Sequence, residues 1–280
     1  MAVTFTAAQR QRLTALDADV ETLERQFAGE EERNAAFKRI EAGRARQNRE
    51  RIGQLLSEKR VTEAFLIERA LTDWLTDSEG FTRVATPTIL SAAMLDKMTI
   101  TAENPLRDQV FWLDPKRCLR PMLAPNLYVV MRELRKITGE PVKIFEAGSC
   151  FRKETQGAEH MNEFTMLNLV EFAGTEDGRQ MERLEDLARG AMKAAGLTRY
   201  ELVREKSTVY GETLDIVADG TEIASGAYGP HPLDANWGVF EPWVGLGVGI
   251  ERVALVKGQH RTIKRVGRSV AFLDGAPLNI

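Results

Sequence analysis

The first part of the chain has the apolar periodicity of helices. Apolar residues recur every three or four positions from Leu13 to Phe27, which predicts an amphipathic helix over residues 6–28. A basic helix follows over 31–57, interrupted at Gly43 and Gly53. A third helix is expected over 61–78.

Strand patterns begin after the third helix. Residues 81–90, FTRVATPTIL, are rich in β-branched side chains and contain Pro87, which restricts such a strand to an edge, a strand end or a covered interface. Residues 109–124 have the pattern of a hairpin. Pro125 then opens a helix that ends near Gly139.

The second half combines runs of strands with a few helices. Residues 141–152 and 161–172 predict two antiparallel strands, 176–195 a helix, 200–248 several short strands, and 249–257 a helix. This order indicates an α+β fold with a mainly antiparallel sheet flanked by helices and preceded by N-terminal helices. It differs from the alternating order of a βαβ protein.

Composition excludes several classes. The chain has 280 residues, of which 43% are hydrophobic, enough for one large domain with a small appendage. No run reaches the roughly 18 apolar residues of a membrane span, and the N-terminus lacks the apolar stretch of a secretory signal. Two cysteines cannot form a disulfide framework, and there is no cysteine or histidine cluster for zinc. We therefore expect a cytoplasmic protein without a membrane partner.

Positive charge is uneven although the net charge is −3. Between Arg33 and Arg60 there are nine Lys and Arg against three Asp and Glu, and the stretch from His260 to Arg268 has no acidic residue. Such patches fit either a solvated helix face or local contact with a polyanion.

The tetrapeptide Phe151-Arg152-Lys153-Glu154 ends one of the two long predicted strands. Strand alternation places Arg152 and Glu154 on one face. A guanidinium beside a carboxylate can hold an anion and a neighbouring amine, as a nucleotide presents them. A surface ion pair is the alternative.

The partner strand carries one amide in an apolar row. Phe164, Met166, Asn168 and Val170 share a face. An unsatisfied buried polar group costs about 1–3 kcal/mol, so Asn168 either bonds internally or receives a polar group of a ligand. Phe164 either packs in the core or stacks on a base.

The stretch G-L-G-V-G-I-E-R, residues 245–252, has alternate glycines. The spacing is not that of a dinucleotide loop, G-x-G-x-x-G, and it occurs late in the chain. Alternate glycines remove side chains from one strand face, so that a flat ligand can lie on the backbone. Arg252 then stands at the start of a helix, where anions are favoured.

Three of these stretches resemble, in order, the signature motifs of class II aminoacyl-tRNA synthetases. FTRVATPTIL with Pro87 resembles motif 1, the dimer-interface element; the Arg152 tetrapeptide resembles motif 2; and GLGVGIER, ending in Arg252, resembles motif 3. Within that class, APNLYVVMRELRK, VKIFEAGSCFRKE, HMNEFTMLNLV, VYGETLDI and WVGLGVGIER are similar to the pyrrolysyl-tRNA synthetase family, in the form that lacks a separate N-terminal tRNA-binding domain. The similarity covers most of residues 60–270.

The resemblance implies activation of an amino acid by ATP with Mg²⁺, followed by transfer to tRNA. Arg152 and Arg252 are the implied catalytic residues, Arg152 on the α-phosphate and Arg252 with His160 on the outer phosphates. Glu154 would hold the adenine amine and Phe164 would stack on the ring. Glu222 and Ser225 would hold Mg²⁺ or the phosphates that it bridges. The implied ATP-binding residues are Arg152, Glu154, His160, Met161, Phe164, Glu222, Ser225 and Arg252.

The resemblance also implies a pyrrolysine pocket, in which Asn168 receives the side-chain amide and Tyr210 is a lid. The implied amino-acid-binding residues are Leu127, Tyr128, Met131, Met166, Asn168, Val170, Tyr210, Ala227, Trp243 and Gly245. Leu246 and Val248 depart from the family's Gly-Ala-Gly-Phe-Gly form, and a bulkier Leu246 would reshape the pocket.

These inferences give an N-terminal helical, partly basic segment over 1–60 and a catalytic domain over 61–280. The expected partners are pyrrolysine, the cognate tRNA and a second copy in a homodimer, with no DNA. With tRNA as partner, the residues expected to contact its backbone are Arg44, Arg46, Arg49 and Arg51. Two alternatives stay open: a class II synthetase or synthetase-like ligase for another bulky amino acid, and a non-catalytic RNA-binding paralogue.

Overall fold

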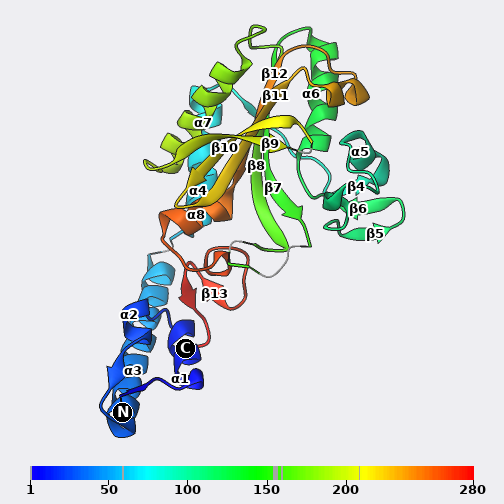
Figure 1. Ribbon diagram of the computed structural model, residues 1–280. Helices are drawn as coiled ribbons and strands as arrows, with labels where there is room; N and C mark the ends of the chain where they lie inside the picture. The colour runs from blue at the N-terminus through cyan, green and yellow to red at the C-terminus, as the bar shows by residue number, and fades with distance from the viewer. Residues whose placement is uncertain (1, 59, 154–156, 159, 208) are drawn as a thin grey trace. The chain divides into compact units, whose positions relative to one another are not determined.

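The chain folds as two compact units in a computed structural model (Figure 1). One unit comprises Met1–Thr62 and Lys264–Ile280, and the other Glu63–Ile263. The structure describes residues 2–58, 60–153, 157–158, 160–207 and 209–280. Residues 264–280, which the sequence pattern groups with 61–280, thus pack with the N-terminal helices.

The smaller unit is built on one long helix, α3 (Glu30–Ser57). Its other elements are α1 (Ala7–Ala15), α2 (Val20–Leu23), the strand pair β1 (Val3–Thr4) with β2 (Gln26–Phe27), and the strand pair β13 (Phe272–Leu273) with β14 (Ala276–Pro277). Its core comprises Phe5, Leu13, Ala18, Phe27 and Ala36. The buried Arg265 donates from Nη1 to the Gly275 carbonyl and from Nη2 to the Thr14 carbonyl, which ties the C-terminal segment to the end of α1.

Two helix predictions in this unit were wrong. The single helix over 6–28 is broken at Asp17, whose φ is 65°, into α1 and α2. Asp19 begins α2 by accepting from the Thr22 amide at 2.7 Å, and such local side-chain bonds compete with helix continuation. Conversely, α3 runs through Gly43 and Gly53 without interruption. A glycine inside a helix costs only about 1 kcal/mol, which a long helix tolerates.

The larger unit contains a seven-stranded sheet in the order β3-β7-β8-β12-β11-β10-β9. All neighbours are antiparallel except β3 and β7. The strands are β3 (Thr82–Arg83), β7 (Val142–Phe151), β8 (Glu163–Phe172), β9 (Glu201–Ser207), β10 (Gly211–Ala218), β11 (Thr221–Gly229) and β12 (Trp243–Gly249). A separate sheet of β4 (Ile89–Ser91), β5 (Trp112–Asp114) and β6 (Arg117–Leu119) has the order β4-β6-β5.

Helices cover both faces of the large sheet (Figure 1). A Cβ built on Gly226 would lie 2.6 Å from Leu184, so α7 (Gln180–Ala195) covers the face of β11 to which that Cβ points. The next residue, Ala227, belongs to a core cluster with Tyr128 and Met131 of α6 (Ala124–Thr138), on the opposite face. The other helical segments are α4 (Glu63–Asp73), η1 (Trp74–Ser78), α5 (Ala92–Lys97), η2 (Pro105–Arg107), η3 (Pro232–Trp237) and α8 (Ile250–Lys257).

The α+β prediction and most of its elements are confirmed. The two long strands pair antiparallel as β7 and β8, with Gly148 opposite Met166. The helix α6 has Pro125 in its first turn and ends at Gly139, whose φ of 72° suits glycine. One strand over 81–90 was wrong, because β3 and β4 belong to different sheets and Pro87 lies between them.

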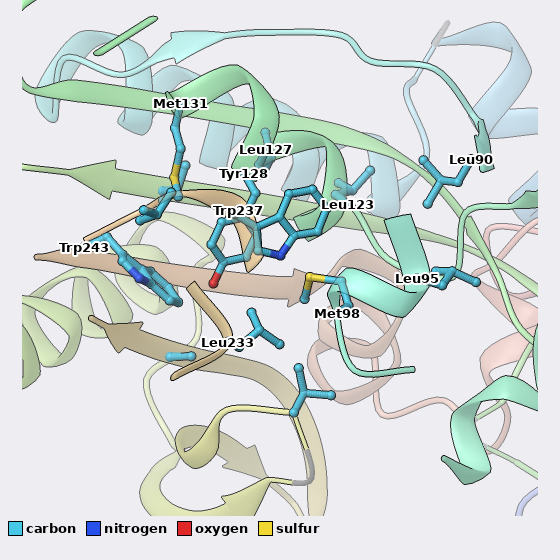
Figure 2. Packing of buried hydrophobic residues seen from close by; sticks show 14 of the residues in the cluster. Leu90, Leu95, Met98, Leu123, Leu127, Tyr128, Met131, Leu233, Trp237 and Trp243 are labelled. Carbon is cyan, nitrogen blue, oxygen red and sulfur yellow. The ribbon is translucent and has the colours of Figure 1, made fainter. Parts of the chain in front are cut away.

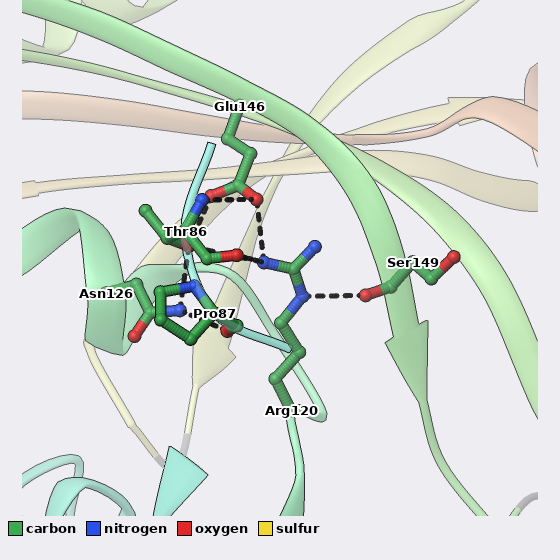
Figure 3. A network of polar contacts seen from close by, with 6 residues as sticks. All are labelled: Thr86, Pro87, Arg120, Asn126, Glu146 and Ser149. Atoms are coloured by element: carbon green, nitrogen blue, oxygen red, sulfur yellow. Dashed lines mark hydrogen bonds and ion pairs between the residues drawn. The ribbon is translucent and has the colours of Figure 1, made fainter. Parts of the chain in front are cut away.

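A buried ion pair ties the Pro87 segment to β7 (Figure 3). Arg120 Nη1 donates to Glu146 Oε1 at 2.7 Å, and both side chains are only 4% exposed. The Thr86 hydroxyl and amide both donate to the same carboxylate. Asn126 in α6 donates to Thr86 Oγ1 and to the Pro87 carbonyl. Arg120 Nε donates to the Ser149 carbonyl, so one guanidinium and one carboxylate join three parts of the chain.

Removing one member of this pair should be strongly destabilising. We expect Arg120→Ala to lower the free energy of unfolding by about 3–5 kcal/mol, because Glu146 would remain buried without its cation. Arg83 and Glu68 provide a matched control, since their ion pair has the same 2.7 Å separation but is more exposed. Arg83→Ala should cost no more than about 1 kcal/mol in urea unfolding. Equal losses for the two variants would contradict the role given to the buried pair.

Candidate active site

Two adjoining cavities lie on the same face of the large sheet as α6. Their volumes, including the parts open to solvent, are about 500 Å³ and 980 Å³, the size of small-molecule sites. They share five lining residues, namely Ala124, Asn168, Tyr210, Ser225 and Gly247. A ligand in one cavity can therefore touch a ligand in the other.

The smaller cavity is apolar. It collects nine of the ten residues predicted to bind the amino acid, which are Leu127, Tyr128, Met131, Asn168, Val170, Tyr210, Ala227, Trp243 and Gly245. The tenth, Met166, lines the larger cavity. Leu127 and Met131 lie one turn apart on α6, so both reach the same wall.

Three aromatic residues, Tyr128, Tyr210 and Trp243, line the apolar cavity, and Figure 2 shows Tyr128 and Trp243 packed with Trp237. The Tyr128 ring stacks on Trp237 with centroids 5.2 Å apart and an interplanar angle of 12°, and it meets Trp243 edge-on at 5.7 Å. Tyr210 meets Trp243 edge-on at 5.9 Å. Burial is the largest cause that raises the pKa of Tyr128 and of Tyr210, so both are neutral donors at physiological pH.

Asn168 stands where the two cavities meet. Its Oδ1 is buried and has no hydrogen-bond partner among the residues that the structure describes. The residue paired with it on β12 is Gly247, where a Cβ would come within 3.0 Å of Asn168 Nδ2. Leaving a buried amide oxygen unpaired costs about 1–3 kcal/mol, and a ligand N–H can recover that cost.

The larger cavity is polar and collects seven of the eight residues predicted to bind ATP. These are Arg152, His160, Met161, Phe164, Glu222, Ser225 and Arg252. The eighth, Glu154, lies outside the described residues. The Arg152 guanidinium lies over the Phe164 ring at 5.4 Å, and its Nε donates to the Pro121 carbonyl at 2.9 Å. The Pro121 carbonyl and the Phe164 ring thus fix the Arg152 side chain, which also lines the cavity.

Glu222, Ser225 and Arg252 form an oxygen-rich wall in the larger cavity. Arg252 Nη1 donates to the Glu222 carbonyl at 2.9 Å and lies 3.6 Å from the Glu222 carboxylate. Desolvation raises the pKa of Glu222, opposed by the nearby Arg252 charge. Ser225 donates to Asp215 Oδ1 at 2.6 Å.

This wall fits Mg²⁺ in its chemistry. Carboxylate and hydroxyl oxygens are the donors that Mg²⁺ prefers. Within the described part of the chain, no cluster of three His, Cys, Asp or Glu could hold a metal by itself. Mg²⁺ needs only one or two carboxylates when a substrate phosphate and water complete its shell.

The alternate glycines of β12 form part of the cavity floor, while the residue between them points away. Gly245 and Gly247 line the smaller cavity, and Gly247 and Gly249 line the larger one. Leu246 also borders the smaller cavity, but it pairs with Gly226, whose Cβ direction leads into α7. Leu246 is 1% exposed on that α7 face. The expectation that its side chain reshapes the pocket was therefore wrong, because strand alternation turns it away.

Three carboxylates near the cavities escaped the sequence analysis. Asp215 faces Ser225 across the β10–β11 hairpin, a register that the alternation of that hairpin could have indicated. Glu251 stands beside Arg252 and accepts the Thr165 amide with both oxygens. Asp234 accepts from Tyr128, which is 106 positions away, so no local sequence signal could have found it.

Neither cysteine is suited to nucleophilic chemistry. Burial raises the pKa of Cys118 to about 11 and that of Cys150 to about 12, so both stay protonated at neutral pH. Among the described helices, none is long and apolar enough to span a membrane.

Two solved structures similar to this chain are described as pyrrolysyl-tRNA synthetases. A structure of Desulfitobacterium hafniense PylSc, a pyrrolysyl tRNA synthetase, is 46% identical with a TM-score of 0.90, covering 100% of this chain and 99% of that one. A crystal structure of pyrrolysyl-tRNA synthetase from the same organism is also 46% identical, with a TM-score of 0.92 and full coverage of both chains.

Curated relatives are more distant. An O-phosphoserine–tRNA(Cys) ligase of Methanocorpusculum labreanum is 26% identical over 53% of this chain, and one of Methanococcus maripaludis is 24% identical over 58%. These matches span only 30% and 34% of the length of those relatives.

A family model covers most of the chain. The model described as tRNA synthetases class II core domain (F) matches residues 57–274, which include all the cavity-lining residues described above. The chain therefore belongs to the class II tRNA synthetase core domain family.

Proposed function

We propose that the protein is an aminoacyl-tRNA ligase that joins pyrrolysine to its cognate tRNA. In the first step the substrate carboxylate attacks the α-phosphate of ATP, giving an aminoacyl-adenylate and pyrophosphate. In the second, a hydroxyl at the 3′ end of the tRNA attacks the acyl carbon and releases AMP. Neither step needs a protein nucleophile, so positioning and charge neutralisation supply the acceleration.

The unpaired Oδ1 of Asn168 carries the assignment of substrate. It is a buried acceptor at the junction of an apolar cavity and a polar one. An amino acid with a long aliphatic side chain and an amide N–H would place the N–H on this oxygen and its apolar end between Leu127, Met131 and Trp243. A phosphorylated side chain would find no Lys or Arg among the described residues that line the apolar cavity.

The polar cavity supports the proposed roles for ATP. Arg152 would neutralise charge that develops on the α-phosphate, and Phe164, already beneath its guanidinium, would stack on the adenine. Arg252 and His160 would contact the outer phosphates, and Glu154 is proposed for the adenine amine. Glu222 and Ser225 would hold Mg²⁺, which when bound would supply positive charge beside the phosphates of ATP.

ATP–pyrophosphate exchange over a panel of amino acids tests the function. With ATP and Mg²⁺ we expect exchange with pyrrolysine and none with O-phosphoserine. Asn168→Ala should lower kcat/KM for pyrrolysine by about 10- to 100-fold, because the substrate amide would lose its acceptor, and Asn279→Ala, an exposed control, should not change it. Exchange with another amino acid alone would contradict the substrate. Tight tRNA binding without any exchange would contradict the enzymatic function.

Arg152→Ala should abolish adenylate formation without unfolding the protein. Removing one preorganised donor to a transition-state anion costs about 10²–10³-fold in kcat, which single-turnover adenylate formation would measure. Light scattering should give Arg152→Ala the same mass as the wild type, because Arg152 lies outside the Pro87 region that we propose as the homodimer interface. Arg204→Ala, on the exposed strand β9, is the control. Turnover at the wild-type rate in Arg152→Ala would remove this residue from the proposed role.

The basic face of α3 is proposed to contact the tRNA backbone. Arg46, Arg49 and Arg51 are exposed, whereas Arg44 is held by Asp19 at 2.5 Å. Changing the three exposed arginines to Gln should weaken tRNA binding and reduce the salt dependence of log K by about 0.7–0.9 for each phosphate that is no longer neutralised. Arg199→Gln, exposed on the larger unit, is the control. Unchanged affinity and salt slope would leave the patch as solvated surface.

A further inference from the structure

Asp234 is a buried carboxylate behind the aromatic end of the apolar cavity. It lies in η3 and is 1% exposed. Its Oδ1 accepts from the Tyr128 hydroxyl at 2.7 Å. Its Oδ2 accepts from Trp243 Nε1 at 2.7 Å and from the His231 amide at 2.6 Å. Three donors from three parts of the chain thus converge on one side chain.

Two of these donors belong to rings that line the cavity. Tyr128 comes from α6 and Trp243 from β12, on different walls of the apolar cavity. A hydroxyl and an indole N–H each fix the in-plane direction of their ring when they bond to a carboxylate, and bonds to charged acceptors are the stronger kind. One carboxylate therefore sets the direction of both rings.

The backbone is shaped to allow this contact. A Cβ on Gly229 would collide with Trp243 Nε1 and would lie 2.5 Å from Asp234 Oδ2. Gly229 pairs with Trp243 in the β11–β12 ladder. The indole consequently lies across a strand position without a side chain, with its N–H directed at the carboxylate.

A purely local role for Asp234 is the main alternative. Through the His231 amide it also caps η3, and a cap alone would explain why an Asp stands there. The cap, however, uses Oδ2, whereas Tyr128 binds Oδ1. Substitutions can therefore separate the two roles, because Tyr128→Phe removes the Oδ1 bond, together with the Tyr128–Tyr210 side-chain bond, and leaves the cap in place.

We propose that Asp234 is a positioning residue that determines amino-acid specificity, by holding Tyr128 and Trp243 at the angles that set the length and width of the apolar cavity. The proposal rests on the proposed function, since it concerns the amino acid that this cavity receives. The ligand class is a long aliphatic side chain with a mid-chain amide, whose far end meets the two rings. Without the Asp234 carboxylate the two rings lose the charged acceptor that fixes their in-plane direction, so the cavity end becomes less defined for such a ligand.

The test measures amino-acid and ATP parameters in three variants. In Asp234→Asn the single remaining oxygen can still cap η3 and accept from Trp243. Its amide group can only donate to the Tyr128 oxygen, so the Tyr128 hydroxyl loses its charged acceptor. We expect Asp234→Asn to raise KM for pyrrolysine by about 10- to 100-fold, as for removal of a hydrogen bond to a charged group, with KM for ATP and kcat nearly unchanged. Preference for pyrrolysine over shorter and longer Nε-acyl-lysines should narrow. Asp219→Asn, on an exposed turn, is the matched control and should behave as wild type.

Tyr128→Phe supplies a second, cap-independent arm. It should shift the pyrrolysine KM in the same direction as Asp234→Asn, and the double variant should be less impaired than the sum of the two, because both remove the bond from the Tyr128 hydroxyl to a charged acceptor. An unchanged amino-acid KM and selectivity in both single variants would overturn the proposal. Equal increases in the KM values for ATP and amino acid, together with lower thermal stability, would indicate that Asp234 only caps η3. That result would also overturn the proposal. If Asp234→Asn does not fold, the Tyr128→Phe result decides.

Failure of the proposed function gives a different pattern. If wild type exchanges with another amino acid instead of pyrrolysine, the same comparison of KM values is made with that amino acid. If no amino acid supports exchange, near-ultraviolet circular dichroism of the ligand-free protein decides. A reoriented Tyr128 should alter that spectrum in Asp234→Asn, and the Asp219→Asn spectrum should match wild type. Identical spectra in all three would overturn the positioning role itself.

Discussion

The buried pair of Arg120 and Glu146 is the interaction on which the geometry of the larger cavity depends. Two charges that are 4% exposed are stable only when they satisfy each other. Around them, Thr86 and Asn126 bring in the segment before β4 and the start of α6. The same arginine presents its carbonyl to the Phe151 amide, and the next carbonyl, that of Pro121, accepts from Arg152 Nε. The position of the Arg152 guanidinium, which lines the larger cavity, thus depends on a charge pair outside that cavity.

Strand alternation then divides the sheet between two tasks. On β12 the glycines line the cavities, while Leu246 and Val248 are buried at 1% exposure or less. On β8 the same alternation gives Met166, Asn168 and Val170 to the cavities. The residues that line the cavities and those that pack against α7 therefore occupy opposite faces of the same strands. Side chains that pack against α7 can change volume without entering the space of the ligands.

The sequence predicted much of this because its signals are local. The start and the end of α6 are marked by Pro125 and Gly139, which are part of the helix or next to it. In β7 and β8 the alternation of side chains with period two indicates which residues share a face. The candidate site was largely predictable because most of its residues occur in a few short stretches that match family motifs. What escaped depends on long-range packing. The role of Asp234 is visible only in the folded chain, where Tyr128, Trp243 and His231 donate hydrogen bonds to its carboxylate. The break at Asp17 has a different cause, because there local capping competes with an otherwise helical apolar pattern.

Gly148 shows how far the active site extends beyond its lining. A Cβ at this position would collide with Arg120 Nη2, because the guanidinium crosses β7 there on its way to Glu146. Gly148 is not among the described residues that line either of the two cavities. Even so, a single methyl group there would push against the charge pair behind Arg152. Inactivating substitutions are consequently expected also at positions such as Gly148, which line neither cavity but leave room for the Arg120–Glu146 pair.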